Sequence, residues 1–237
     1  MIPRSIQKRH PDGLEGNVNI VGSLFLAYFA VLLPTSALRS GRQMVAGKLP
    51  VPRTRAYLQT ILVQWVWFAW AIYATESNGL RLFQPYHLTI GAIVIGALAL
   101  GFKLGALRVI RVDKLPDGTS ASSKLVPRSH YEWALYTAMA VTGGIVEETV
   151  YRGALFSMVG ALIGGWWLPA LSSAACFGGV HLTQGKRAAV YAGVFGLVNQ
   201  AVVYATGTLY VAMVGHMMYD LIAAGVIIRR YPQTALA

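Results

Sequence analysis

Apolar segments of about 20 residues alternate with short polar loops along almost the whole chain. An α-helix of roughly this length crosses a hydrocarbon core about 30 Å thick. The pattern therefore predicts an all-α fold, a polytopic transmembrane helical bundle that forms a single integral-membrane domain over residues 1–237. About seven spans are expected, at 17–35, 56–75, 86–107, 141–163, 166–181, 188–206 and 208–228.

Charged residues are few and unevenly placed. They make up 12% of the chain, against 55% hydrophobic residues, whereas a typical soluble domain has about 25% charged residues. The formal net charge is +11, and Lys and Arg gather in the loops after the first, third and fifth predicted spans and in the tail. Cytoplasmic loops of membrane proteins carry this excess. We therefore expect a multi-pass protein of the cell (inner) membrane, embedded in the lipid bilayer, with its N-terminus outside, its C-terminus in the cytoplasm and no nucleic-acid partner.

Six ionisable residues lie inside the apolar stretches of the C-terminal half. They form three short motifs, which are Glu147-Glu148-x-x-x-Arg152, Phe177-x-x-x-His181 and His216-x-x-x-Asp220. An ionisable group at bilayer depth is costly unless it is paired, and it usually marks function. Each motif alone has an ordinary explanation, as a structural ion pair, a packed histidine or a chance spacing. Three such motifs on three separate segments indicate one functional site.

Helical spacing pairs four of these residues. Residues four apart lie on one face of a helix, so Glu148 can form an ion pair with Arg152, and Asp220 can orient the imidazole of His216. Glu147 lies about 100° around the helix from Glu148, so the two carboxylates need not share a partner.

The unpaired carboxylate has a different expected role. Glu147 is placed to act as a general base for water, and His181 can hold that water or carry a proton. His216 with Asp220 can stabilise the oxyanion that forms when water attacks an amide carbonyl. The predicted chemistry is amide hydrolysis without a covalent intermediate.

Depth along the helix adds a structural expectation. A straight helix that began at Tyr131 would carry Glu147 about 24 Å down, away from its partners. We therefore predict that Tyr131–Ala140 lies partly along the membrane interface, with a break or bend near Gly143-Gly144. Two small-residue motifs, Gly101-x-x-x-Gly105 and Gly160-x-x-x-Gly164, are expected to permit close helix packing.

The three motifs, read as EETVYRG at 147–153, FGGVH at 177–181 and HMMYD at 216–220, resemble those of the CPBP intramembrane proteases. This family includes the type II CAAX prenyl endopeptidase, and the resemblance covers about 127–228. It implies a helical intramembrane fold and an endopeptidase that hydrolyses a peptide bond of a membrane-associated protein or peptide. It also implies that Glu147 and His181 activate water, that Glu148 and Arg152 support them, and that His216 with position 220 stabilises the oxyanion.

One residue departs from the family pattern. The eukaryotic CAAX enzymes of the family that this chain resembles have Asn at the last motif position, where this chain has Asp220. An ionised Asp cannot donate a hydrogen bond to an oxyanion, so Asp220 is expected to orient His216 or to be protonated.

Metal dependence is a second open point. Two His and nearby carboxylates could bind zinc, and members of the resembling family were long called metalloproteases. However, the His-Glu-x-x-His spacing of zinc peptidases is absent, and Arg152 beside the carboxylates disfavours a dication. The sequence therefore favours a glutamate-dependent enzyme without a cofactor, with zinc as the alternative.

Two other function classes compete with the protease. A non-proteolytic membrane scaffold or immunity-type protein of the same fold would have no need for both His181 and His216. A proton-coupled transporter would also use buried Glu, His and Asp, but it favours paired inverted repeats, and none is visible in the sequence. The protease remains the leading hypothesis.

Overall fold

The computed structural model describes residues 18–46, 52–109 and 127–230, and within these ranges every regular element is helical. The described elements are α1 Ile20–Ala27, η1 Tyr28–Leu32, α2 Leu33–Val45, α3 Arg53–Glu76, α4 Ile90–Val109, α6 His130–Glu147, η3 Glu148–Leu155, α7 Phe156–Ile163, α8 Trp167–Val180, η4 His181–Gln184, α9 Lys186–Thr206 and α10 Leu209–Arg230. Where these elements follow one another without a gap they form one helix, so the described chain has seven helices. The predicted all-α fold class is confirmed.

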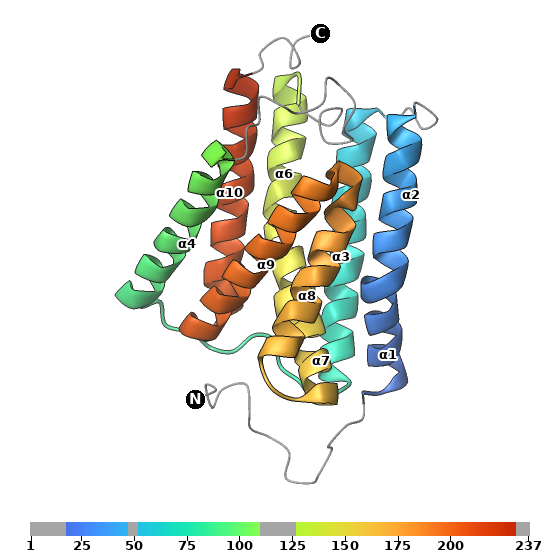
Figure 1. The fold of residues 1–237 in the computed structure, drawn as a ribbon, viewed down its shortest axis with the longest axis vertical. Helices are drawn as coiled ribbons and strands as arrows, with labels where there is room; N and C mark the ends of the chain where they lie inside the picture. The colour runs from blue at the N-terminus through green and yellow to red at the C-terminus, as the bar shows by residue number, and fades with distance from the viewer. Residues whose placement is uncertain (1–17, 47–51, 110–126, 231–237) are drawn as a thin grey trace.

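The helices form one bundle, with α4 at one edge and α1 and α2 at the other (Figure 1). Three of the described helices are long and apolar enough to cross a membrane by length and composition, namely Ile20–Gln43, Lys186–Thr206 and Leu209–Val226. Apolar side chains such as Leu62, Val66 and Leu98 lie exposed on the outside of the bundle. These features are consistent with a multi-pass membrane protein.

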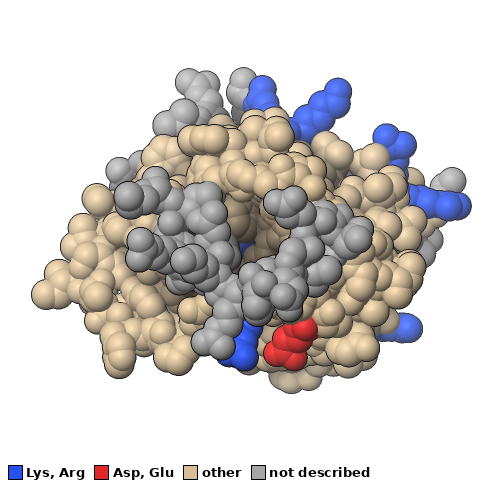
Figure 2. Space-filling model, turned by 90° about the horizontal axis from the view of Figure 1, so that it is seen from below, with Lys and Arg blue, Asp and Glu red and all other residues tan. Residues whose placement is uncertain are grey.

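The two ends of the bundle differ in charge. Figure 2 views the end where α1 begins and α3 finishes, and the Lys and Arg side chains drawn there lie mainly at the rim of the view. Among the described residues near this end, the charged ones are Glu76 and Arg81. The opposite end carries the basic side chains that precede or begin the helices, such as Arg53, Arg128 and Lys186.

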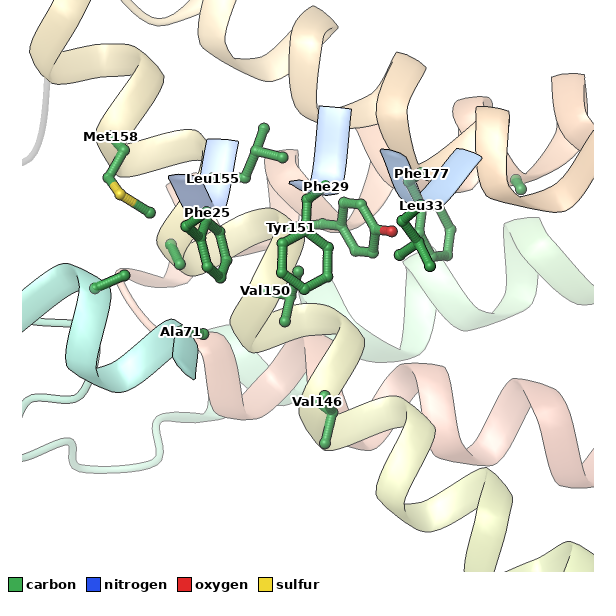
Figure 3. Close-up of a cluster of buried hydrophobic side chains, with 13 residues drawn as sticks. Phe25, Phe29, Leu33, Ala71, Val146, Val150, Tyr151, Leu155, Met158 and Phe177 are labelled. Carbon is green, nitrogen blue, oxygen red and sulfur yellow. The ribbon is translucent and has the colours of Figure 1, made fainter. Parts of the chain in front are cut away.

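Aromatic side chains hold the middle of the bundle together (Figure 3). The ring of Phe29 on η1 lies 6.1 Å from that of Tyr151 on η3, and Tyr151 lies 5.1 Å from Phe177 on α8. Both contacts are edge-to-face, an arrangement that stabilises aromatic pairs beyond their burial. This core fixes η3 between α8 and the N-terminal helix, and η3 carries two of the candidate site residues.

Glycines allow some helices to approach closely, but not at the predicted motifs. A Cβ on Gly144 would clash with Cγ of Met217, and one on Gly178 would lie 2.7 Å from the carbonyl oxygen of Ala189. By contrast, Gly101 and Gly105 have no neighbouring atom within 4 Å of such a Cβ. The prediction of close packing at Gly101-x-x-x-Gly105 is therefore wrong within the described structure, because that face of α4 has no helix against it.

Gly160-x-x-x-Gly164 does not form a close contact either. A Cβ on Gly160 would meet only Cγ of Pro169, at 3.8 Å, which is ordinary contact. Gly164 instead adopts φ +67 and ends α7. A positive φ is a conformation that glycine reaches without strain, so this glycine serves the turn into α8.

The predicted break near Gly143-Gly144 is also wrong. α6 runs as an unbroken α-helix from His130 to Glu147, and both glycines are buried within it. α10 extends equally far, because 14 residues separate His216 from its end at Arg230. Figure 1 shows α6 and α10 both reaching past the turn that joins α8 to α9. Glu147 therefore lies deep along its helix and still meets its partners without a bend.

Candidate functional site

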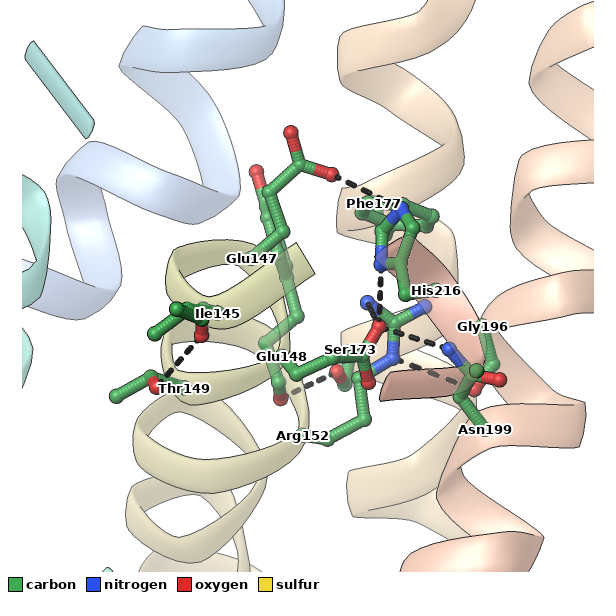
Figure 4. Close-up of polar contacts among 12 residues, drawn as sticks. Ile145, Glu147, Glu148, Thr149, Arg152, Ser173, Phe177, Gly196, Asn199 and His216 are labelled. Atoms are coloured by element: carbon green, nitrogen blue, oxygen red, sulfur yellow. Dashed lines mark hydrogen bonds and ion pairs between the residues drawn. The ribbon is translucent and has the colours of Figure 1, made fainter. Parts of the chain in front are cut away.

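The helix changes its winding where the first motif begins. α6 ends at Glu147, and residues Glu148–Leu155 follow as a π-helical segment in which every residue is buried. A π-helical turn is rare and often lies at a functional site, because it redirects the side chains around it. Here it separates the two neighbouring carboxylates, and Figure 4 shows Glu147 and Glu148 approaching His216 from different sides.

Glu148 is the buried centre of the site. Its side chain is 0% exposed, and its Oε1 atom lies 2.7 Å from Nδ1 of His216 and 3.4 Å from Nη1 of Arg152. The Nδ2 amide of Asn199 donates a further hydrogen bond of 2.8 Å to the same oxygen. Three groups from three helices thus converge on one carboxylate oxygen, and the predicted pairing of Glu148 with Arg152 is observed.

Arg152 is held by more than its carboxylate. Its guanidinium carbon lies 4.1 Å from the centre of the Phe177 ring, within range of a cation–π contact. Its Nε donates to the carbonyl oxygen of Gly196 at 3.4 Å. A Cβ at residue 196 would lie 3.0 Å from Nη2 of Arg152. Glycine at this position therefore leaves room for the guanidinium between η3 and α9.

His216 connects the buried part of the site to its open part. A carboxylate oxygen only accepts hydrogen bonds, so Nδ1 of His216 donates to Glu148. The other ring nitrogen, Nε2, faces Oδ2 of Asp220 at 3.6 Å and Oε2 of Glu147 at 3.8 Å. Both separations exceed a hydrogen bond. Nε2 therefore remains available to a further group between the two carboxylates.

The exposed fraction of the side chains increases from the buried ion pair to the two carboxylates that face Nε2 of His216. The side chains of Arg152 and Glu148 are 1% and 0% exposed, that of His216 is 12%, and those of Glu147 and Asp220 are 25% and 32%. Glu147 and Asp220, whose contacts to His216 are too long for hydrogen bonds, are thus the two carboxylates that another molecule can reach. The site therefore has a rigid interior and an accessible rim.

His181 lies beside this group rather than within it. It follows α8 in the short 3-10 helix η4, and its Nδ1 lies 2.8 Å from the carbonyl oxygen of Phe177. Because a carbonyl oxygen only accepts, Nδ1 carries the proton and Nε2 keeps its lone pair. The Phe177 ring lies 4.6 Å from the His181 ring and 6.1 Å from the His216 ring. No hydrogen bond or ion pair among the described residues joins His181 to the other five.

A small pocket lies beside η4, the short helix that begins with His181. It has a volume of about 260 Å³ and lies between the end of α2 and η4. Its lining is mostly apolar, formed by Leu38, Gly41, Arg42, Ala46, Leu182 and Thr183. The pocket is at the basic end of the bundle, and Arg42 is one of its lining residues.

Two polar residues of the site were missed in the sequence. Asn199 on α9 is 3% exposed, and Lys103 on α4 is 2% exposed. Nζ of Lys103 donates to Oδ1 of Asn199 at 3.1 Å, so the two extend the network from Glu148 to a further helix. The signal was available for Lys103, since a lone lysine within an apolar span is a candidate functional residue. For Asn199 the sequence offers only an unpaired amide in an apolar helix.

The observed geometry does not form a zinc site. Zinc needs about four ligands at roughly 2.0–2.3 Å, and no group of three or more His, Cys, Asp or Glu among the described residues could hold a metal ion. Nδ1 of His216 already donates to Glu148, and Arg152 adds a positive charge at the same carboxylate. The residues present do not fit the metal, and no step of the chemistry below uses one.

Comparison with known protein families gives a match to the part of the chain that contains the three motifs. The chain matches the family of type II CAAX prenyl endopeptidase Rce1-like proteins over residues 129–222, so it contains a domain of this CPBP family, as the sequence motifs predicted. The family is generally one of proteases. No curated protein and no solved structure matches the chain. The matched residues include the three motifs and Asn199 but not Lys103, which lies on α4.

Proposed function

We propose that the chain is an intramembrane endopeptidase that hydrolyses a peptide bond of a membrane-associated protein or peptide. The observation that carries the proposal is the unequal treatment of two adjacent carboxylates. Glu148 is buried, accepts two hydrogen bonds and pairs with Arg152, whereas Glu147 is partly exposed and has only a long contact to His216. A carboxylate that is held by its neighbours, as Glu148 is, suits a supporting role, and one that is free to bind water, as Glu147 is, suits a catalytic role. The family match over residues 129–222 supports the same reaction class.

In the proposed reaction Glu147 acts as the general base. It accepts a proton from a water molecule as the water oxygen attacks the carbonyl carbon of the peptide bond. Nε2 of His216, when it carries a proton, faces the space between Glu147 and Asp220 and donates to the oxyanion that develops. Glu147 then returns the proton to the leaving amine as the carbon–nitrogen bond breaks. No covalent intermediate with the enzyme is formed.

The remaining residues hold these groups in place. Glu148 accepts from Nδ1 of His216 and thereby sets the direction of Nε2. Arg152 holds Glu148, and His181, with its free Nε2, is placed to orient the water. Asp220 lies 3.6 Å from Nε2 and is four residues from His216 on α10, so we assign it to orienting the imidazole rather than to binding the oxyanion.

We further propose that the site opens toward the cytoplasmic side of the cell (inner) membrane. The end of the bundle nearest His181 is the one with the basic side chains, whereas the charged residues described near the opposite end are Glu76 and Arg81. Cytoplasmic loops carry such an excess of Lys and Arg. This orientation puts the N-terminus outside, the C-terminus in the cytoplasm, and the pocket beside η4 on the cytoplasmic side.

The test is a peptidase assay of the detergent-purified chain against a mixed peptide library. We expect wild-type protein to cleave, Glu147→Gln to lose cleavage by at least about 100-fold because the base is gone, and the exposed control Glu76→Gln to cleave normally. A strong chelator should leave cleavage unchanged.

Each contrary result has a defined meaning. Equal cleavage by wild type and Glu147→Gln would remove Glu147 from the mechanism. A different outcome is that the purified protein carries one zinc ion per chain. If removal of that zinc abolished cleavage and its addition restored cleavage, the glutamate-dependent mechanism would be replaced by a metal-dependent one. A cellular phenotype that tolerates Glu147→Gln, together with no cleavage of the library, would indicate a scaffold or immunity-type protein.

A further inference from the structure

Lys103 is a buried lysine in a helix that otherwise presents apolar side chains outward. It is 2% exposed, whereas Leu98 and Phe102 on the same helix are 70% and 55% exposed. α4 lies at the edge of the bundle and packs against α9 and α10 (Figure 1). A buried ammonium group in such a place is costly unless its partners compensate. The identity of those partners therefore indicates what Lys103 does.

The partners of Lys103 lead to the candidate site by two routes. Its Nζ donates to Oδ1 of Asn199 at 3.1 Å, and Nδ2 of the same amide donates to Oε1 of Glu148 at 2.8 Å. Nζ also donates to the carbonyl oxygen of Gly215 at 3.3 Å. Gly215 directly precedes His216 in the chain. One route thus reaches the imidazole through Glu148, and the other reaches the backbone beside it.

The amide of Asn199 has a defined orientation because of this arrangement. The assignment of oxygen and nitrogen in an Asn side chain depends on its hydrogen-bonding partners. Here the oxygen faces an ammonium group, which only donates, and the nitrogen faces a carboxylate, which only accepts. The reverse orientation would place like partners together at both ends. Lys103 therefore directs the amide toward Glu148.

We propose that Lys103 is a positioning residue of the peptidase site, which through Asn199 and Glu148, and through the Gly215 carbonyl, fixes the direction of the His216 imidazole. The inference rests on the proposed function for its kinetic consequence, but the geometry that it assigns does not depend on that function. Lys103 lies outside residues 129–222, so the family match does not include it.

Charge gives a reason for the use of lysine here. Three carboxylates, those of Glu147, Glu148 and Asp220, lie near His216, and Arg152 pairs with one of them. Lys103 adds a second fixed positive charge without contacting any carboxylate, because the Asn199 amide stands between it and Glu148. A cation placed this way supports the buried carboxylate and leaves the catalytic one free.

The competing explanation is that Lys103 only fastens α4 to the bundle. The structure offers a matched control for it in Gly96, also on α4, where an added Cβ would lie 2.8 Å from Cγ1 of Val211 on α10. Gly96→Ala, seven residues before Lys103, should strain the contact of α4 with α10 at Val211, while the charge and the hydrogen bonds of Lys103 remain. Lys186→Met removes an exposed lysine from the start of α9 and controls for charge alone.

The kinetic test measures kcat and KM for Lys103→Met, Asn199→Leu, the double variant and the two controls. Misplacement of a catalytic group by about 1 Å can cost roughly 100-fold, so we expect kcat of Lys103→Met to fall roughly 10- to 100-fold with KM little changed. The double variant should be no slower than the slower single variant, because both act through one chain of contacts. Gly96→Ala should lower the melting temperature and retain kcat.

A second readout is independent of cleavage. In protein labelled with ¹⁵N-histidine, the Nδ1–H signal of His216, identified by its loss in His216→Gln, should shift in Lys103→Met and in Asn199→Leu but not in Lys186→Met. If wild type cleaves no peptide, the proposed function fails, and this spectrum alone decides the role of Lys103.

Several results would overturn the inference. They are an unchanged kcat and His216 signal in Lys103→Met, an equal loss of kcat in Gly96→Ala, and additive losses in the double variant. Lys103→Gln, which keeps a donor but not the charge, serves if Lys103→Met does not fold. Failure of both variants to fold would assign Lys103 to folding instead of positioning.

Discussion

Replacement of Arg152 by methionine is the sharpest test of how the buried carboxylate is held. Methionine is apolar and flexible, so it can remain in contact with the Phe177 ring that now lies 4.1 Å from the guanidinium. The change removes the ion pair at 3.4 Å and leaves Glu148, which is 0% exposed, with the bonds from His216 and Asn199. The second carboxylate oxygen has no hydrogen-bond partner among the described residues. The variant therefore keeps a buried charge and loses its fixed counter-charge.

The expected cost follows from that burial. Removal of one partner of a buried ion pair typically destabilises a protein by about 3–5 kcal/mol. The two remaining bonds place the expected loss near the lower end, at about 3 kcal/mol. For a chain of this size, about 1 kcal/mol changes the melting temperature by roughly 2–4 °C. Arg152→Met should therefore melt roughly 6–12 °C below wild type.

The assay is thermal unfolding in one detergent at one heating rate, because membrane proteins often unfold irreversibly. The matched control is the double variant Glu148→Gln/Arg152→Met, which removes both charges and should recover part of the lost stability, since a neutral replacement of a buried pair is often tolerated. A single variant that melts within about 2 °C of wild type, or a double variant no more stable than the single one, would refute the account of Glu148 as a charge that needs Arg152.

Three further predictions concern packing, pH and orientation. Gly144→Ala should lower both stability and cleavage, because its Cβ would meet Met217 on α10. Gly101→Ala, which has open space around its Cβ, should change neither. Equal effects of the two variants would contradict the close approach of α6 to α10. Burial raises the pKa of Glu132, but the Arg128 backbone N–H and the Arg53 guanidinium outweigh it and lower that pKa below 4.5. Its stabilisation should thus be complete above pH 4.5 and lost as the pH falls through the lower folded-state pKa, so the melting temperatures of wild type and Glu132→Gln should converge on acidification. Reporter fusions should give cytoplasmic signals at three of four positions, with an extracytoplasmic signal at Gly79 and a cytoplasmic one at Pro52, Gly118 and Gly185, and an extracytoplasmic Gly118 would reverse the proposed orientation.

The sequence predicted most of the fold because hydrophobic length alone determines where membrane helices can form. Each predicted span coincides largely with one described helix. Helical spacing likewise predicted that Glu148 meets Arg152 and that Asp220 lies near His216. These are contacts within one helix, and they follow from the 3.6-residue period.

Contacts between helices were harder to predict from the sequence. The depth argument for a break at Gly143-Gly144 assumed that the partners of Glu147 lie near the membrane surface, whereas α10 carries His216 to the same depth as Glu147. The π-helical segment after Glu147 has no distinct sequence signal, and the buried carboxylate, Glu148, is its first residue. Both outcomes depend on how the helices pack, which hydrophobic pattern does not specify.

The network around Glu148 explains why its members could not be recognised one at a time. In the sequence, nothing distinguishes Asn199 from other amide residues. In the structure, its oxygen accepts from Lys103 and its nitrogen donates to Glu148. Lys103 in turn is separated from Asn199 by 96 positions in the chain. A residue of this kind acquires its role from two neighbours on other helices, so its function is visible only when those helices are placed together. Two of the three contacts of the Glu148 carboxylate come from α9 and α10. It follows that substitution of Lys103, which lies on α4 outside the matched domain, should affect the site through Asn199 and Glu148 although the helices that carry the motifs are unchanged.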